Sequence, residues 1–290
     1  MLLIGDNTLK LLSWNIQWGR GIDGQVDLAR IVDTIRRIDD FDVICLQEVA
    51  IRFPGLAGSC GEDQMTELAS CLQGYTPIYG VATDVPDGSG GRSQFGNAIF
   101  TRLPVGQVWR HLLPWAAELS TPSMQRMLLE AVIITQFGPV RIMTTHLEYY
   151  SQHQRNMQIQ AIRDRHVEAC AMSQRLYLNE ECGGTFEVFP RPETAILCGD
   201  MNFPATAPER ERILAPFETG IPRFQDAWSV LHPDQPHIAT VGIHPVDFVD
   251  QPACFDFIFI TENLAQQLKS FNCDTMTEAS DHQPVWVEFE

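Results

Sequence analysis

Eight short runs of apolar and β-branched residues recur along the chain, and they restrict its fold more than any other feature of the sequence. In the last run, Val285, Val287 and Phe289 alternate with Trp286 and Glu288, which is the period-two pattern of a strand. So many strands with few helices predict two β-sheets. The predicted strands lie within 9–19, 42–49, 96–102, 127–135, 139–147, 194–199, 254–261 and 284–290.

Two segments, 27–38 and 151–176, have the character of helices. The second is a long polar stretch without Gly or Pro. The first has apolar residues at helical spacing, namely Leu28, Ile31, Val32, Ile35 and Ile38. Helices on the outer faces of two packed sheets would cover every apolar surface, so the sequence predicts an α+β fold of this kind.

The chain shows no internal repeat, low-complexity tract or change of composition that would mark a domain boundary. Its 290 residues are near the upper size for a single core, and we predict one domain over residues 1–290. The predicted long loops are rich in Gly, Pro and charged residues, and they are 52–64, 83–95, 178–193 and 231–252.

The composition excludes several classes of protein and ligand. With 44% hydrophobic and 20% charged residues, the chain does not resemble a disordered, collagen-like or coiled-coil protein. Its 37 acidic and 20 basic residues give a formal charge of −17, which opposes non-specific attraction to duplex DNA. A small or terminal phosphate substrate is therefore favoured over a long polyanion.

The first residues, the apolar stretches and the cysteines indicate where in the cell the protein is located. The first residues lack the basic start and apolar run of a secretory signal, and no stretch approaches the roughly 20 apolar residues of a membrane span. The eight cysteines form no CxxC pair, which fits a reducing compartment better than a disulfide framework. We therefore predict a cytoplasmic protein without membrane insertion, and no feature indicates an obligate protein partner.

The pattern that carries the chemistry is a recurrence: an apolar run ends, and a carboxylate, amide or imidazole follows at once or opens the next run. If these strand ends converge, they form one polar site on a rigid scaffold. The residues concerned are Asn15, Glu48, His146, Asp200 with Asn202, Asp256, and Asp281 with His282.

Hydrolysis of a phosphate ester needs such a set, because an attacking water must be activated while phosphoryl charge is neutralised. Glu48, helped by Asn15 and Asp281, offers the oxygen ligands that a hard cation prefers. The chain lacks the clustered Cys and His of a zinc site. Magnesium is the predicted metal, with manganese as the alternative.

Two residue pairs have the form of catalytic devices. Asp200 and Asn202 lie two apart in a predicted turn, where one side chain can act on water while the other fixes its geometry. Asp256 and His282 match the device in which a carboxylate fixes an imidazole tautomer and favours the protonated ring against a phosphate.

Seven motifs together resemble those of the endonuclease/exonuclease/phosphatase superfamily: LLSWNIQWG, CLQEV, GNAIFTRLPV, TTHLE, ILCGDMNF, FDFIFIT and ASDHQPVWVEF, in this order. The resemblance implies a four-layer αββα sandwich with a divalent-metal site at one rim. It makes Glu48 the main metal ligand, with Asn15 and Asp281 nearby, and Asp200 the residue that activates water. It gives Asn202 an orienting role, places His146 and His282 against the phosphate, and makes Asp256 the support of His282.

A further similarity points to the tyrosyl-DNA phosphodiesterase branch, in which a basic residue precedes a strand and THLE precedes an Arg-x-x-Gln helix. Arg126, Arg155 and Gln158 match this pattern, and the two arginines are the predicted substrate-binding residues. The GDMNFPATAPE turn also resembles that of deadenylases. Many relatives have a basic residue two positions before the aspartate of the FDFIF strand, whereas this chain has Cys254 and Phe255 there. Because this basic residue is missing, tight binding of nucleic acid is less favoured.

The sequence thus predicts a metal-dependent hydrolase of phosphate esters or phosphodiesters, with a small molecule or a nucleic-acid end as substrate. A DNA-repair or RNA-processing nuclease is the alternative within enzymes. A non-catalytic scaffold of the same fold is a third alternative, against which the complete set of Glu48, Asp200, Asn202 and His282 argues.

Overall fold

The computed structural model describes residues 8–174, 184–187, 189–246 and 249–290. The strands are β1 (Leu9–Asn15), β2 (Val43–Ile51), β3 (Thr76–Pro86), β4 (Arg92–Thr101), β5 (Val105–Leu112), β6 (Met127–Thr135), β7 (Gly138–His146), β8 (Ala195–Asp200), β9 (Phe224–Asp226), β10 (Asp256–Thr261), β11 (Leu268–Cys273) and β12 (Val285–Phe289). The helices are α1 (Leu28–Ile38), α2 (Gln64–Cys71), α3 (Gln152–Ser173), α4 (Pro208–Leu214) and α5 (Ala227–Leu231). Short 3₁₀ turns cover Gln17–Gly19, Gly184–Phe186 and Glu262–Leu264.

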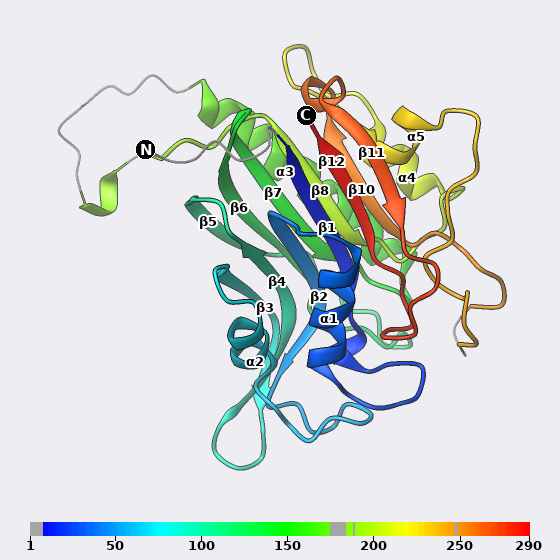
Figure 1. Ribbon diagram of the computed structural model, residues 1–290. Coiled ribbons are helices and arrows are strands. Elements are labelled where there is room, and N and C mark those ends of the chain that lie inside the picture. Colours follow the sequence, from blue (N-terminus) through cyan, green and yellow to red (C-terminus); the bar gives the residue numbers. More distant parts are fainter. Residues whose placement is uncertain (1–7, 175–183, 188, 247–248) are drawn as a thin grey trace.

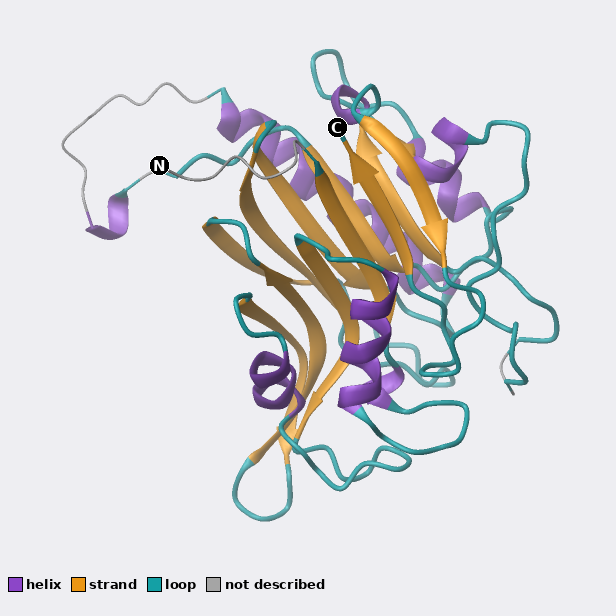
Figure 2. Cartoon of the chain, in the orientation of Figure 1, coloured by secondary structure: helices purple, strands orange, loops and turns teal. Residues whose placement is uncertain are grey.

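The strands form two six-stranded sheets, with the orders β11–β12–β1–β2–β4–β3 and β5–β6–β7–β8–β10–β9. Both are mixed, because β1 and β2 are parallel in one sheet and β7 and β8 are parallel in the other. All eight predicted strand runs are strands of these sheets. Figures 1 and 2 show the sheets packed face to face, with α1 and α2 in front and α3 and α4 behind.

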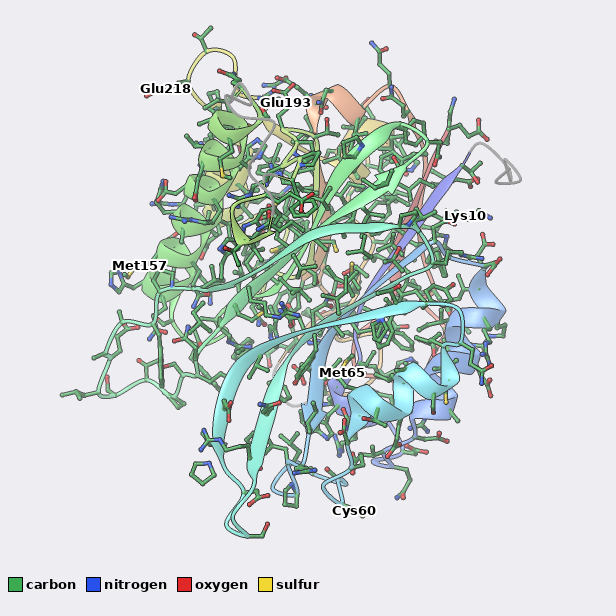
Figure 3. All side chains as sticks on the ribbon, turned by 90° about the vertical axis from the view of Figure 1, so that its left-hand side faces the viewer. Lys10, Cys60, Met65, Met157, Glu193 and Glu218 are labelled. Atoms are coloured by element: carbon green, nitrogen blue, oxygen red, sulfur yellow. The ribbon has the colours of Figure 1, made fainter. Side chains whose placement is uncertain are left out.

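Three apolar layers hold the four structural layers together. One lies between the sheets and includes Leu11, Leu129 and Ile258. A second joins the first sheet to α1 and α2, and a third joins the second sheet to α3 and α4. Figure 3 shows the two helical faces edge-on, with Met65 of α2 and Met157 of α3 on opposite sides of the molecule. The predicted αββα sandwich is confirmed.

Local sequence explains where the two predicted helices begin. The side chain of Asp27 accepts a hydrogen bond from the backbone N–H of Arg30 at the start of α1, and Ser151 does the same for Gln154 at the start of α3. Helix α3 is confirmed over Gln152–Ser173, while residues 175 and 176 of the predicted segment lie outside the described residues. No helix in the described ranges is long and apolar enough to cross a membrane.

The predicted loop 83–95 is wrong. Its residues continue β3 and begin β4, so that only 87–91 form the turn of a hairpin. This end of the hairpin is polar, and Asp84 pairs with Arg92 and Gln94 across the two strands. Because few apolar residues alternate there, the strand pattern is absent from the sequence. The predicted loops 178–193 and 231–252 fall partly outside the described residues.

The sheets bring several strand ends to one rim. The parallel pairs β1–β2 and β7–β8 end there, and β10 and β12 begin there because they run antiparallel to β8 and β1. Figure 3 shows the direction of the strands: Lys10 of β1 and Glu193, just before β8, lie in the upper part, and Cys60, in the loop after β2, lies at the bottom. The polar residues of the sequence motifs therefore meet at the lower rim.

Gly199 allows β8 to approach β7 at this rim. Its φ is +135°, and an added Cβ would lie 1.9 Å from the carbonyl oxygen of Thr145. A side chain at this position would force apart the two strands that carry His146 and Asp200.

We expect Gly199→Ala to destabilise the fold by about 3 kcal/mol or more, because both the backbone conformation and the contact with Thr145 exclude a methyl group. Urea unfolding followed by circular dichroism measures this change. Gly55→Ala is the control, since nothing lies within 4 Å of the Cβ it would gain. Equal stability of the two variants would contradict the constraint on Gly199.

A buried network of charged residues surrounds Glu130 on β6, in the second sheet. Both oxygens of Glu130 accept hydrogen bonds from Arg191 at 2.9 Å, His111 Nε2 lies 3.0 Å from Oε2, and Arg141 Nη1 lies 3.6 Å from Oε1. Burial alone would raise the pKa of Glu130, but His111 and the two arginines outweigh burial and lower it to about 2.

We expect this network to stabilise the fold at neutral pH and to fail in acid. A carboxyl group whose folded pKa lies below its unfolded value of 4.5 contributes stability above pH 4.5 and loses it as the pH falls toward 2. The shift corresponds to about 3 kcal/mol. Unfolding free energies of Glu130→Gln should therefore fall less steeply between pH 4.5 and 2 than those of the natural chain. The exposed Glu67→Gln should keep the natural slope, and parallel curves for all three chains would refute the assignment.

Candidate active site

Asp200, at the end of β8, lies at the centre of the polar rim. Its Oδ2 accepts a hydrogen bond of 3.0 Å from Asn15 Nδ2, and it lies 3.3 Å from His146 Nε2 and 3.7 Å from His282 Nε2. These partners come from the end of β1, the end of β7 and the segment before β12. The predicted convergence of strand ends is therefore present in the structure, although the chemical role of each residue stays a prediction.

The turn after Asp200 is held by its own side chains. Asp200 Oδ1 accepts the backbone N–H of Asn202 at 2.9 Å, and Asn202 Nδ2 donates to the carbonyl oxygen of Leu147 at 2.8 Å. Asn202 has a φ of +54°, a conformation that asparagine tolerates better than most residues. The turn thus fixes both residues against β7.

Glu48 reaches the rim through an irregularity in β2. The register between β2 and β4 shifts between Leu46 and Val49, and Glu48 has a φ of +63°. The bulge turns the carboxylate toward Asn15 and His146: Asn15 Nδ2 donates to Glu48 Oε1 at 3.1 Å, and His146 Nδ1 lies 3.7 Å from the same oxygen. Asn15 and His146 therefore bridge Glu48 and Asp200.

His282 is held by a buried carboxylate. Its Nδ1 lies 2.8 Å from Asp256 Oδ2, and the hydroxyl of Thr240 donates to the same oxygen at 2.6 Å. Burial would lower the pKa of His282, but the charges of Asp256 and Asp200 raise it well above its usual value. The ring is therefore an imidazolium that lies between two carboxylates.

His146 has the opposite character. Burial, and next the charge of Arg126, lower its pKa well below the usual value, so the ring is neutral near pH 7. Burial raises the pKa of Asp200 to about 6, against the opposing charge of His282. A buried carboxylate with a pKa near neutrality can exchange a proton with water under physiological conditions.

The donor set at Glu48 fits a hard cation. Burial, and next the charge of Asp281, raise the pKa of Glu48 to about 7. Its Oε2 is buried and has no hydrogen-bond partner in the described part of the chain. A divalent cation would relieve the repulsion between Glu48 and Asp281 and would satisfy this oxygen, and oxygen donors of this kind suit Mg²⁺ or Mn²⁺.

A second group of possible ligands lies beside it. One ligand atom each of Asp200, Asp256 and His282 lies within 4.8 Å of the others. Nδ1 of His282 is already bonded to Asp256, and its Nε2 lies 3.7 Å from Asp200 Oδ2. The unpartnered Oε2 favours Glu48 as the ligand of a cation, and the roles of Asp200, Asp256 and His282 stay predictions.

The two predicted substrate-binding arginines differ in their surroundings. Arg126 is buried beside the site, where it lines a small recess with His146, and its Nε lies 3.5 Å from Glu148 Oε2. The described interactions of Arg155 are outside the polar cluster: Nη1 donates to the carbonyl oxygens of Glu148 and Tyr149, and Nη2 lies 3.3 Å from Glu209. Arg155 thus holds the turn between β7 and α3, and its contact with substrate stays a prediction.

Three supporting residues escaped the sequence analysis. Gln17 Nε2 donates to Asp281 Oδ2 at 2.5 Å, Thr240 supports Asp256, and Glu148 accepts from Arg126. Gln17 and Glu148 each lie two positions after a residue singled out by its motif, which was the signal available. No sequence motif marks Thr240, because it lies in a long loop and contacts Asp256 only in the folded structure.

Comparison with known proteins gives a consistent result. The model of the endonuclease/exonuclease/phosphatase family matches residues 12–282. No curated protein gives a significant match to the sequence. Among solved structures, an endonuclease/exonuclease/phosphatase from Beutenbergia cavernae has a TM-score of 0.67 at 21% identity, covering 98% of this chain and 72% of its own.

Two other similar structures are those of a phosphatase and of a protein bound to DNA. A mannosyl-6-phosphatase of Bacteroides thetaiotaomicron has a TM-score of 0.64 at 18% identity, with 96% of this chain and 98% of that chain covered. TDP2 of D. rerio, complexed with a single-strand DNA product, has a TM-score of 0.63 at 19% identity, with 98% and 100% covered. At these identities the likeness is one of fold.

We expect Glu48→Gln to weaken Mg²⁺ binding at least tenfold, because the substitution removes the charge that would meet the cation. Isothermal titration calorimetry with MgCl₂ measures the affinity directly. Glu218→Gln is the matched control, since Glu218 is exposed and lies at the end of the molecule away from the rim (Figure 3). An unchanged affinity in Glu48→Gln would place the cation elsewhere.

Proposed function

The chain belongs to the endonuclease/exonuclease/phosphatase family, and we propose that it is a divalent-metal-dependent hydrolase of phosphate esters or phosphodiesters in which Asp200 activates the attacking water. Members of this family are hydrolases that act on phosphate esters. The resemblance drawn from the seven sequence motifs is thereby confirmed, and the similarity in fold extends to TDP2.

The observation that carries the proposal is the position of Asp200, on which Asn15, His146 and His282 converge. Its carboxylate accepts a proton from water near neutral pH because burial has raised its pKa to about 6. Asn202 fixes the turn in which that carboxylate lies. Asp200 therefore serves as general base, and Asn202 keeps it in position.

The two histidines meet the phosphoryl group in different charge states. His282 is an imidazolium that Asp256 holds by Nδ1, so its other nitrogen faces the rim as a charged donor. His146 is neutral, so it has one ring N–H to donate and adds no charge. Arg126, beside His146, supplies a further cation for the phosphoryl oxygens. Charge that develops in the transition state is thus met by fixed donors.

Glu48 would hold the metal, with Asn15 and Asp281 directly or through water. Once bound, Mg²⁺ or Mn²⁺ supplies positive charge that polarises the phosphoryl group and stabilises the leaving oxygen. A location in the cytoplasm remains part of this proposal, as does action without an obligate partner.

A nucleic-acid end is the second candidate substrate. It is supported by TDP2, a protein of the same fold complexed with single-strand DNA. The mannosyl-6-phosphatase of the same fold supports a small phosphate ester instead. The formal charge of −17 favours the small ester or a short single-stranded end over a duplex. A scaffold without catalysis would have no use for the buried and mutually repelling carboxylates of the rim.

We expect Asp200→Asn to abolish turnover while leaving the fold intact, because the amide preserves the shape of the turn but cannot accept the proton. The assay is hydrolysis of bis-p-nitrophenyl phosphate and p-nitrophenyl phosphate with Mg²⁺, with Mn²⁺ or with EDTA. The natural chain should release p-nitrophenol only with metal, and the variant should lose at least a thousandfold in kcat.

Asp33→Asn is the matched control, since Asp33 lies exposed on α1. Circular dichroism of all three chains separates loss of chemistry from loss of folding. Full turnover by Asp200→Asn would refute the role of Asp200, and turnover in EDTA would refute the need for a metal.

A further inference from the structure

A pocket of about 240 Å³ adjoins the proposed metal site. Asp281 and Gln17 line the side that the pocket shares with the site, and Arg20 to Ile22 and Pro245 to Val246 line the rest. Because Asp281 belongs to both, a molecule bound with its phosphate at the metal can extend into this pocket. Apart from Asp281, and Gln17 that donates to it, the residues of the pocket have no part in the proposed hydrolysis.

Arg20 is the charged residue of this pocket that lacks a partner. Its side chain makes no hydrogen bond or ion pair within the described residues, and its Nε is buried without an acceptor. The nearest carboxylates in the sequence are otherwise engaged: Asp23 lies 2.7 Å from Arg30, and Asp27 caps α1. The two terminal nitrogens of Arg20 are not enclosed in this way, so an anion in the pocket can pair with them without breaking a bond within the protein.

Backbone hydrogen bonds hold the loop that carries Arg20. Arg20 pairs with Val26 in an isolated bridge, Gly21 N–H donates to the carbonyl oxygen of Gln25, and Ile22 N–H donates to that of Glu278. The loop is thereby tied both to itself and to the segment before Asp281. Preorganisation of this kind lowers the entropic cost of gripping a ligand.

Charge explains why one arginine matters here. The chain carries a formal charge of −17, so a dianionic group is repelled by the molecule as a whole. Asp281 would repel it locally too, but Gln17 and Ser280 donate to its carboxylate, and a cation at Glu48 would offset its charge. Arg20 is then the group that can make the pocket attractive to an anion.

We propose that Arg20 forms a second anion subsite, which binds a phosphate group of the substrate other than the one that is hydrolysed. This inference rests on the proposed function, because it takes the scissile phosphate to lie at Asp200 and Glu48. It names the substrate class as molecules with two phosphate groups, such as a nucleotide within a short strand or a bisphosphate, rather than simple monoesters.

The test compares two ligands that differ by one phosphate group. Thymidine 5′-monophosphate and thymidine 3′,5′-bisphosphate are used as competitive inhibitors of bis-p-nitrophenyl phosphate hydrolysis, with Mg²⁺ present. The natural chain, Arg20→Gln and Arg212→Gln are compared by the ratio of the two inhibition constants, which cancels any general change in activity. Arg212 is the control because it is exposed, lies outside the pocket and loses the same charge.

We expect the bisphosphate to bind about tenfold more tightly than the monophosphate to the natural chain and to Arg212→Gln, and the ratio to fall close to one in Arg20→Gln. A ratio near one in the natural chain, or an unchanged ratio in Arg20→Gln, would overturn the subsite. If no chain hydrolyses the diester, the proposed function is what fails. Calorimetric binding of the two ligands to the natural chain and Arg20→Gln then decides the subsite by the same ratio.

Discussion

Mutual repulsion among the buried carboxylates of the rim is the constraint around which the rest of the site is arranged. Burial raises the pKa of Glu48, Asp200 and Asp281 alike, so each resists its own charge. Neighbouring groups offset part of this cost: Asn15 donates to two of the carboxylates, Gln17 donates to the third, and His282 contributes a positive charge. Among the described residues of the rim, Oε2 of Glu48 and Oδ1 of Asp256 are buried carboxylate oxygens without a hydrogen-bond partner, and a divalent cation at Glu48 would satisfy the first of them.

The scaffold brings these carboxylates close together through a close approach of two strands and through unusual backbone conformations at Glu48 and Asn202. The close approach of β8 to β7 depends on Gly199, which has no Cβ to strike Thr145. A bulge with a positive φ aims Glu48, and a second positive φ aims Asn202. Strain of this kind persists because two packed sheets fix the flanking residues on both sides. The stability of the sandwich and the geometry of the site are therefore linked.

The sequence predicted the parts of the fold and site that local pattern determines. Buried strands appear in the sequence as short apolar runs, and a polar residue marks the end of such a run, as Asp200 does at the end of β8. The end of the β3–β4 hairpin, predicted as a loop over 83–95, was missed because polar residues pair across it, as Asp84 and Arg92 do. Thr240 was missed for another reason: it meets Asp256 from 16 residues away through the fold alone, and no local pattern encodes such a contact.

The charge distribution reconciles an acidic protein with an anionic substrate. Long-range repulsion from a net charge of −17 is screened within about 8 Å at physiological ionic strength, so contacts at the rim decide binding. There the cationic groups are few and fixed: His282 between two carboxylates, Arg126 beside His146, and Arg20 in the adjoining pocket. Under the proposed function, a long polyanion would have to contact acidic surface far beyond the rim, whereas a short phosphate ester would meet mainly these local cations. The overall charge and the local cations thus both support the short phosphate ester that we propose as substrate.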